Sequence, residues 1–365
     1  MLGLAACGSS SATDTSASAG ARTVTVTLVE SGCAGPSLRP SRAGATTFQV
    51  TNSGAAAVSE AEILQGERVL AEKENLAPGL SGSFSVSLDP AEYSLYCPGA
   101  ATEKTPFTVT AATSASGPTQ STSPELDKAV ASYQAYVKDQ AGQLVVATRG
   151  FAAAVTAGDV AQAKSLFGPT RAFYERIEPV AESFGDLDPG IDARENDVDD
   201  PAQWGGFHRI EKALWVSGST AGMVPVARKL VADVEKLQGL AATAEYPPAQ
   251  LANGASELLD EVGKSKVTGE EDRYSHSGLY DFAANVEGAQ KAYQLLEPEL
   301  KTKDAALATT IDQRFTDVTT ALAAYRDGPG YVDYSTVGQP QRRALAQKVD
   351  ALAEPLSHVS ALIVT

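Results

Sequence analysis

The periodicity of apolar residues changes once along this chain, at the low-complexity stretch SASGPTQSTSP (114–124). Before it, short segments such as RTVTVTLVE and TTFQVTNSG alternate apolar and polar residues, which is typical of strands with one buried face. After it, apolar residues recur at intervals of three and four, the spacing of amphipathic helices. A sheet and a bundle of helices bury their apolar residues in different layers. We therefore expect a β domain followed by a helical domain.

The two periodicities and the low-complexity stretch between them predict that the chain has four parts. Residues 1–21 form a flexible N-terminal tether, 22–111 a small antiparallel β-sandwich or barrel, 112–124 a linker, and 125–365 a bundle of seven or more helices. Ser123, Asp159 and Asp304 each precede an apolar-periodic run, so we expect them to cap helices.

The charge of the chain limits its ligands. The sequence has 45 acidic and 29 basic residues, a formal net charge of −16. Such a surface repels nucleic acid and anionic membranes, so we expect no nucleic-acid partner and favour a cationic ligand. The sequence contains no apolar run of about 18 residues, the length that a transmembrane helix needs.

The first residues resemble the lipobox of bacterial lipoproteins. In Leu4–Ala5–Ala6–Cys7–Gly8, a branched apolar residue and two small residues precede a cysteine, and a Ser/Thr/Ala-rich stretch follows. The alternative is a chance run of small residues. The basic segment that normally precedes a lipobox is missing, so we expect the natural start to lie upstream. Acylation of Cys7 would anchor the protein outside the cytoplasmic membrane, in an oxidising compartment.

A histidine and a glutamate stand three residues apart in GGFHRIEKALW (205–215). On a helix, His208 and Glu211 share one face and can converge on one ion. The pair alone is a weak signal, because such pairs are common on solvated helix faces.

Two further acidic segments flank this pair in the sequence. Upstream lie Glu175, Glu178 and Asp192, and downstream lies the run GEEDRYSH (269–276). For Glu270 and Asp272 we favour a simple role in the first turn of a helix, where carboxylates complement the helix dipole. If the bundle brings the three segments together, the resulting oxygen-rich site with one imidazole would suit iron, zinc or manganese.

Three long blocks carry a family resemblance: FYERIEPVAESFGDLDPGIDAR, FHRIEKALW and TGEEDRYSHSGLYDFAANVEGAQKAY. They resemble the imelysin-like domain, whose family pattern is an H-x-x-E motif. Together with a β domain that resembles cupredoxins and a lipoprotein-like start, the order of parts resembles the EfeO family of iron-uptake lipoproteins from Arg22 onward. The resemblance implies a Greek-key, cupredoxin-like sandwich followed by an imelysin-like helical bundle.

The resemblance also implies a metal site. Its ligands would be His208, Glu211, Glu175, Glu178, Asp192 and Glu271, with Glu270 the runner-up for Glu271. The implied cargo is iron, Fe(II) or Fe(III), with zinc or copper as further candidate ions. The implied partners are an iron permease of the EfeU kind and a haem peroxidase of the EfeB kind.

Two function classes remain open on the sequence. We favour an extracytoplasmic iron-binding lipoprotein without enzymatic activity. The alternative is an imelysin-like zinc metallopeptidase, although zincins use two histidines four residues apart, and here the order is H-x-x-E with no second histidine nearby.

The β domain raises a separate question about its two cysteines. Residues 22–111 contain no histidine and no methionine, which argues against a blue-copper centre. The family resemblance implies a tentative second metal site built from Cys33, Cys97 and Glu62, with Glu60 as a further ligand. A disulfide between the two cysteines is the alternative, and both stay open.

Overall fold

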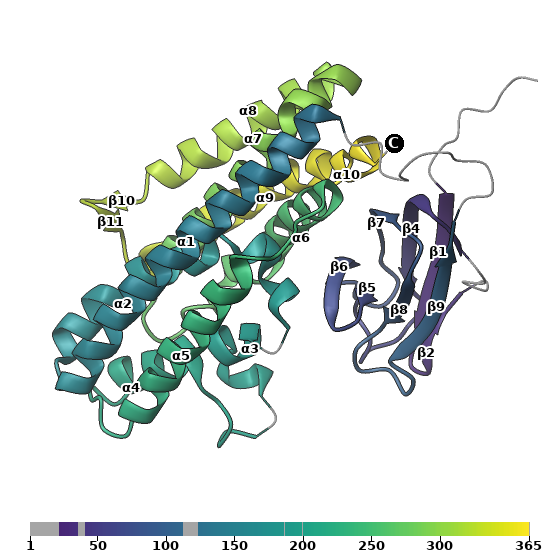
Figure 1. Cartoon of the computed structure of the whole chain (residues 1–365). Helices are drawn as coiled ribbons and strands as arrows, with labels where there is room; N and C mark the ends of the chain where they lie inside the picture. Colours follow the sequence, from purple (N-terminus) through teal and green to yellow (C-terminus); the bar gives the residue numbers. More distant parts are fainter. Residues whose placement is uncertain (1–21, 36–40, 112–122, 186, 199, 365) are drawn as a thin grey trace, which may run out of the picture.

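A computed structural model describes residues 22–35, 41–111, 123–185, 187–198 and 200–364. Strands make up the first part and helices dominate the part after residue 123, so the expected order of a β region and a helical region is confirmed (Figure 1). Cys7, the tether and most of the linker lie outside the described residues.

The β part consists of two sheets (Figure 1). The first has the strand order β2 (Gly32–Ala34), β1 (Arg22–Val29), β4 (Gly44–Asn52) and β7 (Ser81–Leu88). The second has the order β3 (Ser41–Arg42), β9 (Lys104–Thr110), β8 (Glu92–Tyr96), β5 (Ala61–Gln65) and β6 (Arg68–Lys73). Alternate residues of β1 and β4 are buried, and Phe48 stacks on Phe84 with ring centroids 5.1 Å apart.

Most neighbouring strands are antiparallel, as the alternating pattern predicts, but two pairs are parallel. β1 runs parallel to β4, and β3 runs parallel to β9. After β2 the chain contributes β3 to the second sheet and then returns as β4 beside β1. A crossover of this kind, unlike a hairpin, brings two strands together in the same direction. Strand periodicity does not distinguish the two connections.

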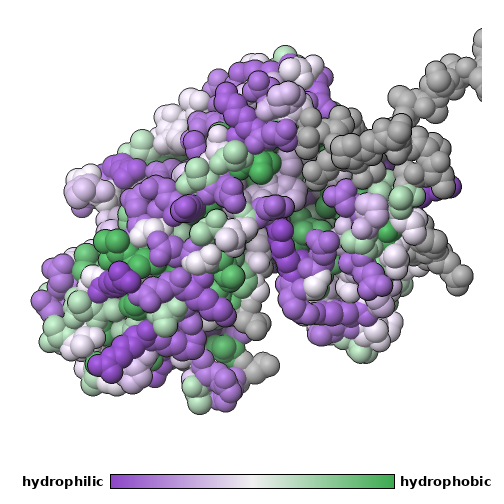
Figure 2. Space-filling view, in the orientation of Figure 1, coloured by the Kyte–Doolittle hydropathy of each residue, from purple (hydrophilic) through white to green (hydrophobic). Residues whose placement is uncertain are grey.

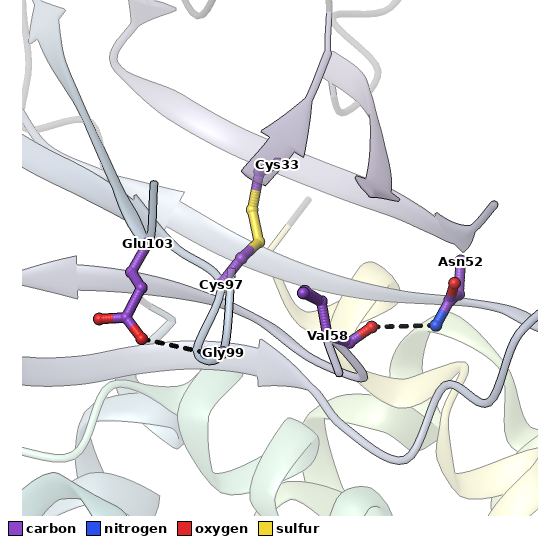
Figure 3. Close-up of a disulfide and its surroundings, with 6 residues drawn as sticks. All are labelled: Cys33, Asn52, Val58, Cys97, Gly99 and Glu103. Atoms are coloured by element: carbon purple, nitrogen blue, oxygen red, sulfur yellow. Dashed lines mark hydrogen bonds between the residues drawn. A yellow bond between two sulfur atoms is a disulfide. The ribbon is translucent and has the colours of Figure 1, made fainter. Parts of the chain in front are cut away.

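A disulfide joins Cys33 to Cys97 across 64 residues of sequence (Figure 3). Cys33 lies on β2 of the first sheet, and Cys97 directly follows β8 of the second, so the bond links the two sheets. The loops beside it are held by side chains: Asn52 donates to the carbonyl of Val58, and the amide of Gly99 donates to Glu103. Of the two alternatives for these cysteines, the structure contains the disulfide.

The helical part is built on long antiparallel helices that bury one continuous apolar core. Its helices are α1 (Pro124–Ala157), α2 (Val160–Glu175), α3 (Leu187–Asp192), α4 (Gly206–Trp215), α5 (Val224–Ala241), α6 (Pro248–Lys264), α7 (Leu279–Lys303), α8 (Ala305–Ala323), α9 (Gln339–Leu356) and α10 (Val359–Ile363). Short 3-10 turns are η1 (Glu178–Phe184), η2 (Glu195–Asp197), η3 (Lys266–Thr268) and η4 (Tyr334–Thr336), and β10 (Arg326–Asp327) pairs with β11 (Gly330–Tyr331).

The predicted caps are present. Ser123, Asp159 and Asp304 accept hydrogen bonds from backbone amides in the first turns of α1, α2 and α8. No helix in the described part of the chain is long and apolar enough to cross a bilayer.

Polar contacts join β6 and β7 of the β part to α6 of the helical part. Lys73 Nζ lies 2.6 Å from Glu257 and 3.0 Å from Asp260, and Asn253 donates to the carbonyl of Ser85 at 2.7 Å. The edge of the β part that faces the helices is hydrophilic (Figure 2). A cavity of about 350 Å³ lies between the parts, and its walls include the acidic residues Glu72, Glu74, Glu178, Asp188, Glu257, Glu261 and Glu270.

Candidate metal centre

The candidate metal centre lies where α2, α3 and α4 meet the segment that precedes α7. The start of α4 comes very close to the end of α3: a Cβ on Gly206 would lie 2.2 Å from the carbonyl oxygen of Ile191. Gly206 also has a φ of 71°, which favours glycine. This close approach places His208, in the first turn of α4, beside Asp192 at the end of α3.

His208 and Glu211 both face inward, at 1% and 0% exposure. His208 Nδ1 lies 3.0 Å from Glu211 Oε2. The other oxygen of Glu211 accepts the backbone amides of Tyr274 (3.0 Å) and Ser275 (2.7 Å). Both oxygens of Glu211 are therefore engaged, and its carboxylate orients the imidazole.

The second ring nitrogen of His208 faces two carboxylates. Nε2 is buried and has no hydrogen-bond partner among the described residues. It lies 3.7 Å from Asp192 Oδ1 and 3.4 Å from Glu271 Oε1. Buried polar atoms are normally satisfied, so an unpartnered ring nitrogen beside two carboxylate oxygens points to a ligand. Neutral imidazole and carboxylate oxygen are ligand types that iron and zinc accept.

Two sets of three side chains have ligand atoms close enough to hold one ion. The first is Asp192, His208 and Glu271, and the second is His208, Glu211 and Asp272. The first set uses the unpartnered Nε2. The second depends on Nδ1, which Glu211 already occupies, so the first set is the better arranged of the two.

Arg171 is completely buried among these carboxylates and was not singled out by the sequence analysis. Its guanidinium binds Asp192, lies 3.1 Å from Glu271 Oε1 and 2.5 Å from Glu175 Oε1. Its Nε lies 3.2 Å from Asp281 and 3.6 Å from Asp272. From sequence, Arg171 and Glu175 are one more i, i+4 ion pair, which is normally a surface feature.

A second buried cation, Lys266, binds Glu175 and Glu178. Its ammonium group lies 3.2 Å from Glu175 and 2.5 Å from Glu178, and Asn285 also donates to both carboxylates. Of the six predicted ligands, the structure therefore gathers His208, Glu211, Asp192 and Glu271. Glu175 adjoins them through Arg171, and Glu178 lies one contact further out.

The charges of the centre determine its protonation. Burial and Arg171 oppose a charged His208, but the neighbouring carboxylates of Glu211, Glu271 and Asp192 outweigh them and raise its pKa to about 10. Burial raises the pKa of Asp272 to about 6, against the opposing effect of Arg171. For Glu271, burial is outweighed by Lys266 and His208, which hold its pKa well below the usual range. A cation that binds Nε2 must therefore displace a proton.

The run GEEDRYSH differs from its sequence-based interpretation. Helix α7 begins only at Leu279, so Glu270 and Asp272 do not lie in a first helical turn. Glu270 is exposed, whereas Asp272 is 1% exposed and faces Arg171. The interpretation of Asp272 was wrong because a tight turn, with His276 at a φ of 56°, directs it into the centre. Of the two adjacent candidates, Glu271 is the buried one.

The tentative second site in the β part has a different character. The disulfide removes both cysteine sulfurs as thiolate ligands in this form of the protein. Glu62 lies on β5 at 9% exposure, and burial, together with the charge of Glu60, raises its pKa to about 8. Burial also raises the pKa of Glu60. With its pKa near 8, the Glu62 carboxyl group is mostly protonated at neutral pH, which disfavours cation binding there.

Comparison with known proteins shows relatives along almost the whole chain. The imelysin family model matches residues 129–359. The chain is 40% identical over 343 residues to proteins named iron uptake system component EfeO from Escherichia coli K12 and from Shigella flexneri, covering 93% of this chain and 91% of each relative. The chain therefore belongs to the imelysin family and, within it, to the EfeO type of iron-uptake component.

Proposed function

We propose that this protein binds iron outside the cytoplasmic membrane and passes it to a membrane permease. Iron is the cargo, and Asp192, His208 and Glu271 hold it. Glu211 orients His208. The relatives named as iron-uptake components support the cargo, and the lipobox-like residues before Cys7 support a lipid anchor. The permease and a partner haem peroxidase follow from the family resemblance.

The observation that carries this proposal is the unpartnered Nε2 of His208. It is buried, it faces Oδ1 of Asp192 and Oε1 of Glu271, and no described residue satisfies it. A cation held by these three atoms would give Nε2 the partner that it lacks.

The cavity between the two parts supports access to this centre. Arg194 lines the cavity, and its Nη1 lies 3.1 Å from Glu271 Oε2. Acidic side chains line the same cavity, and the chain as a whole carries a net charge of −16. Both raise the local concentration of cations.

Calorimetric titration with Fe(II) under anaerobic conditions, and with Fe(III) citrate, tests the proposal. His208→Ala and Glu271→Gln should each weaken binding by about 100-fold or more, because each removes a ligand. Glu270→Gln is the matched control, since Glu270 is adjacent in sequence but exposed. Equal affinities of parent, His208→Ala and Glu271→Gln would contradict the proposal.

The same proteins distinguish binding from catalysis. The iron- and zinc-loaded parent should leave casein and peptide libraries intact, because an uptake component needs ligand exchange and no chemical step. Peptide hydrolysis that His208→Ala abolishes would instead favour the metallopeptidase alternative.

A further inference from the structure

Arg171 and His208 converge on the same two oxygen atoms. Oδ1 of Asp192 is bound by Nη1 of Arg171 and lies 3.7 Å from His208 Nε2. Oε1 of Glu271 lies 3.1 Å from Nη2 of Arg171 and 3.4 Å from His208 Nε2. The guanidinium therefore occupies the two oxygens that a cation held by Asp192, His208 and Glu271 would need.

Arg171 has a charge that does not depend on pH in the physiological range. Its side chain is fully buried, and its guanidinium lies 5.8 Å and 5.7 Å from the ring centroids of Phe167 and Phe207. An arginine remains protonated in proteins. The carboxylates around it would repel one another if this charge were absent.

We propose that Arg171 is a built-in counter-ion that competes with the cargo: an entering cation displaces the guanidinium from Asp192 and Glu271. This inference rests on the proposed function of the centre. The guanidinium of Arg171 has other carboxylate partners, so it needs to move only a short way when it leaves Asp192 and Glu271. Its Nε faces Asp281 and Asp272, and its Nη2 also faces Glu175, so the guanidinium can turn away without leaving the cluster.

Competition of this kind sets both the strength and the charge dependence of binding. Without Arg171, the empty centre would attract any cation strongly and release it slowly. Repulsion between Arg171 and a cation scales with the charge of the cation. Removal of the arginine charge should therefore increase the affinity for both kinds of ion. The gain in binding free energy should be about 1.5 times larger for a trivalent ion than for a divalent ion.

The test compares Arg171→Gln with Arg171→Lys in the full chain, with Zn(II) and Tb(III) as divalent and trivalent probes. In Arg171→Gln we expect affinity to rise about 10-fold for Zn(II) and about 30-fold for Tb(III). Arg171→Lys keeps a positive charge at the site, so for both ions its affinity should rise much less than that of Arg171→Gln. Weaker binding by Arg171→Gln, or an equal gain for the two ions, would overturn the proposal, because a purely structural arginine predicts a loss.

A measurement on the parent protein covers the case in which Arg171→Gln does not fold. The Nε–Hε NMR signal of Arg171, assigned by its disappearance in Arg171→Lys, should be protected from exchange in the ion-free protein and shift on saturation with Zn(II). An unchanged signal at saturation would refute the displacement.

The variant Arg171→Gln/His208→Ala separates this inference from the proposed function. If Arg171→Gln binds tightly and the double variant does not, the gain arises at the centre. Binding by Arg171→Gln but not by the parent would contradict the proposed function and support competition by Arg171. If neither protein binds an ion, both proposals are wrong.

Discussion

His208 Nδ1 lies 3.0 Å from Glu211 Oε2, while Glu211 Oε1 accepts the backbone amides of Tyr274 and Ser275. Glu211 thus ties the first turns of α4 to the segment that carries Glu271. The H-x-x-E spacing serves to aim Nε2 at Asp192 and Glu271.

Glu211→Gln should weaken metal binding by about 10- to 100-fold, the usual effect of losing a residue that orients a ligand. The amide keeps the shape of the side chain but removes the charge that holds the imidazole. Titration calorimetry of Glu211→Gln beside His208→Ala measures the difference. If Glu211 is itself a ligand, the two variants will lose equal affinity, which would contradict an orienting role.

Lys73 should be the main polar determinant of the interface between the two parts. Lys73→Met leaves Glu257 and Asp260 without their shared cation, and loss of one partner of a buried ion pair costs about 3 to 5 kcal/mol. Urea unfolding should show this loss, and small-angle X-ray scattering should show a larger radius of gyration.

Lys104→Met is the matched control for Lys73→Met. Lys104 pairs with Glu67 at the surface, where their side chains are 43% and 88% exposed. Such exposed pairs contribute at most about 1 kcal/mol. Equal effects of the two substitutions would show that the Lys73 contacts do not stabilise the interface.

The disulfide should stabilise the β part and leave few free thiols. Replacing Cys33 and Cys97 together by serine should lower the free energy of unfolding by about 2 to 5 kcal/mol, because the bond closes a long loop. Thiol titration of the denatured, unreduced chain should detect no thiol other than Cys7. Reactive Cys33 and Cys97 in protein isolated from an oxidising compartment would favour thiolate ligation instead.

Glu62 should make the β part less stable as the pH rises. Its pKa is raised from 4.5 to about 8 in the folded protein. Below pH 4.5 the carboxyl group is protonated in both states, so it has no effect. Between these values only the unfolded chain ionises, and stability falls with rising pH.

Glu62→Gln should therefore match the parent near pH 4 and exceed its stability by about 4 kcal/mol at pH 8. Urea unfolding at several pH values measures this. Glu92→Gln, at an exposed position on β8, is the control and should follow the parent. A constant difference between Glu62→Gln and the parent across pH would contradict the raised pKa.

The local features of this chain were predictable from its sequence. Strand and helix periodicity depend on which neighbouring residues must share a buried face, and that information is local. The caps at Ser123, Asp159 and Asp304 likewise need only adjacent amides. The spacing of His208 and Glu211 also defined one face of a helix without knowledge of the rest of the fold.

Only the tertiary structure decided which charged groups meet. Arg171, Lys266 and Asp272 resemble ordinary surface residues in the sequence, and each is buried because α2, α4 and the segment before α7 converge. The parallel pairing of β1 with β4 and the bond between Cys33 and Cys97 depend on the route of the chain between sheets. Contacts between residues distant in sequence follow from the packing of whole elements, and no local pattern of residues records that packing.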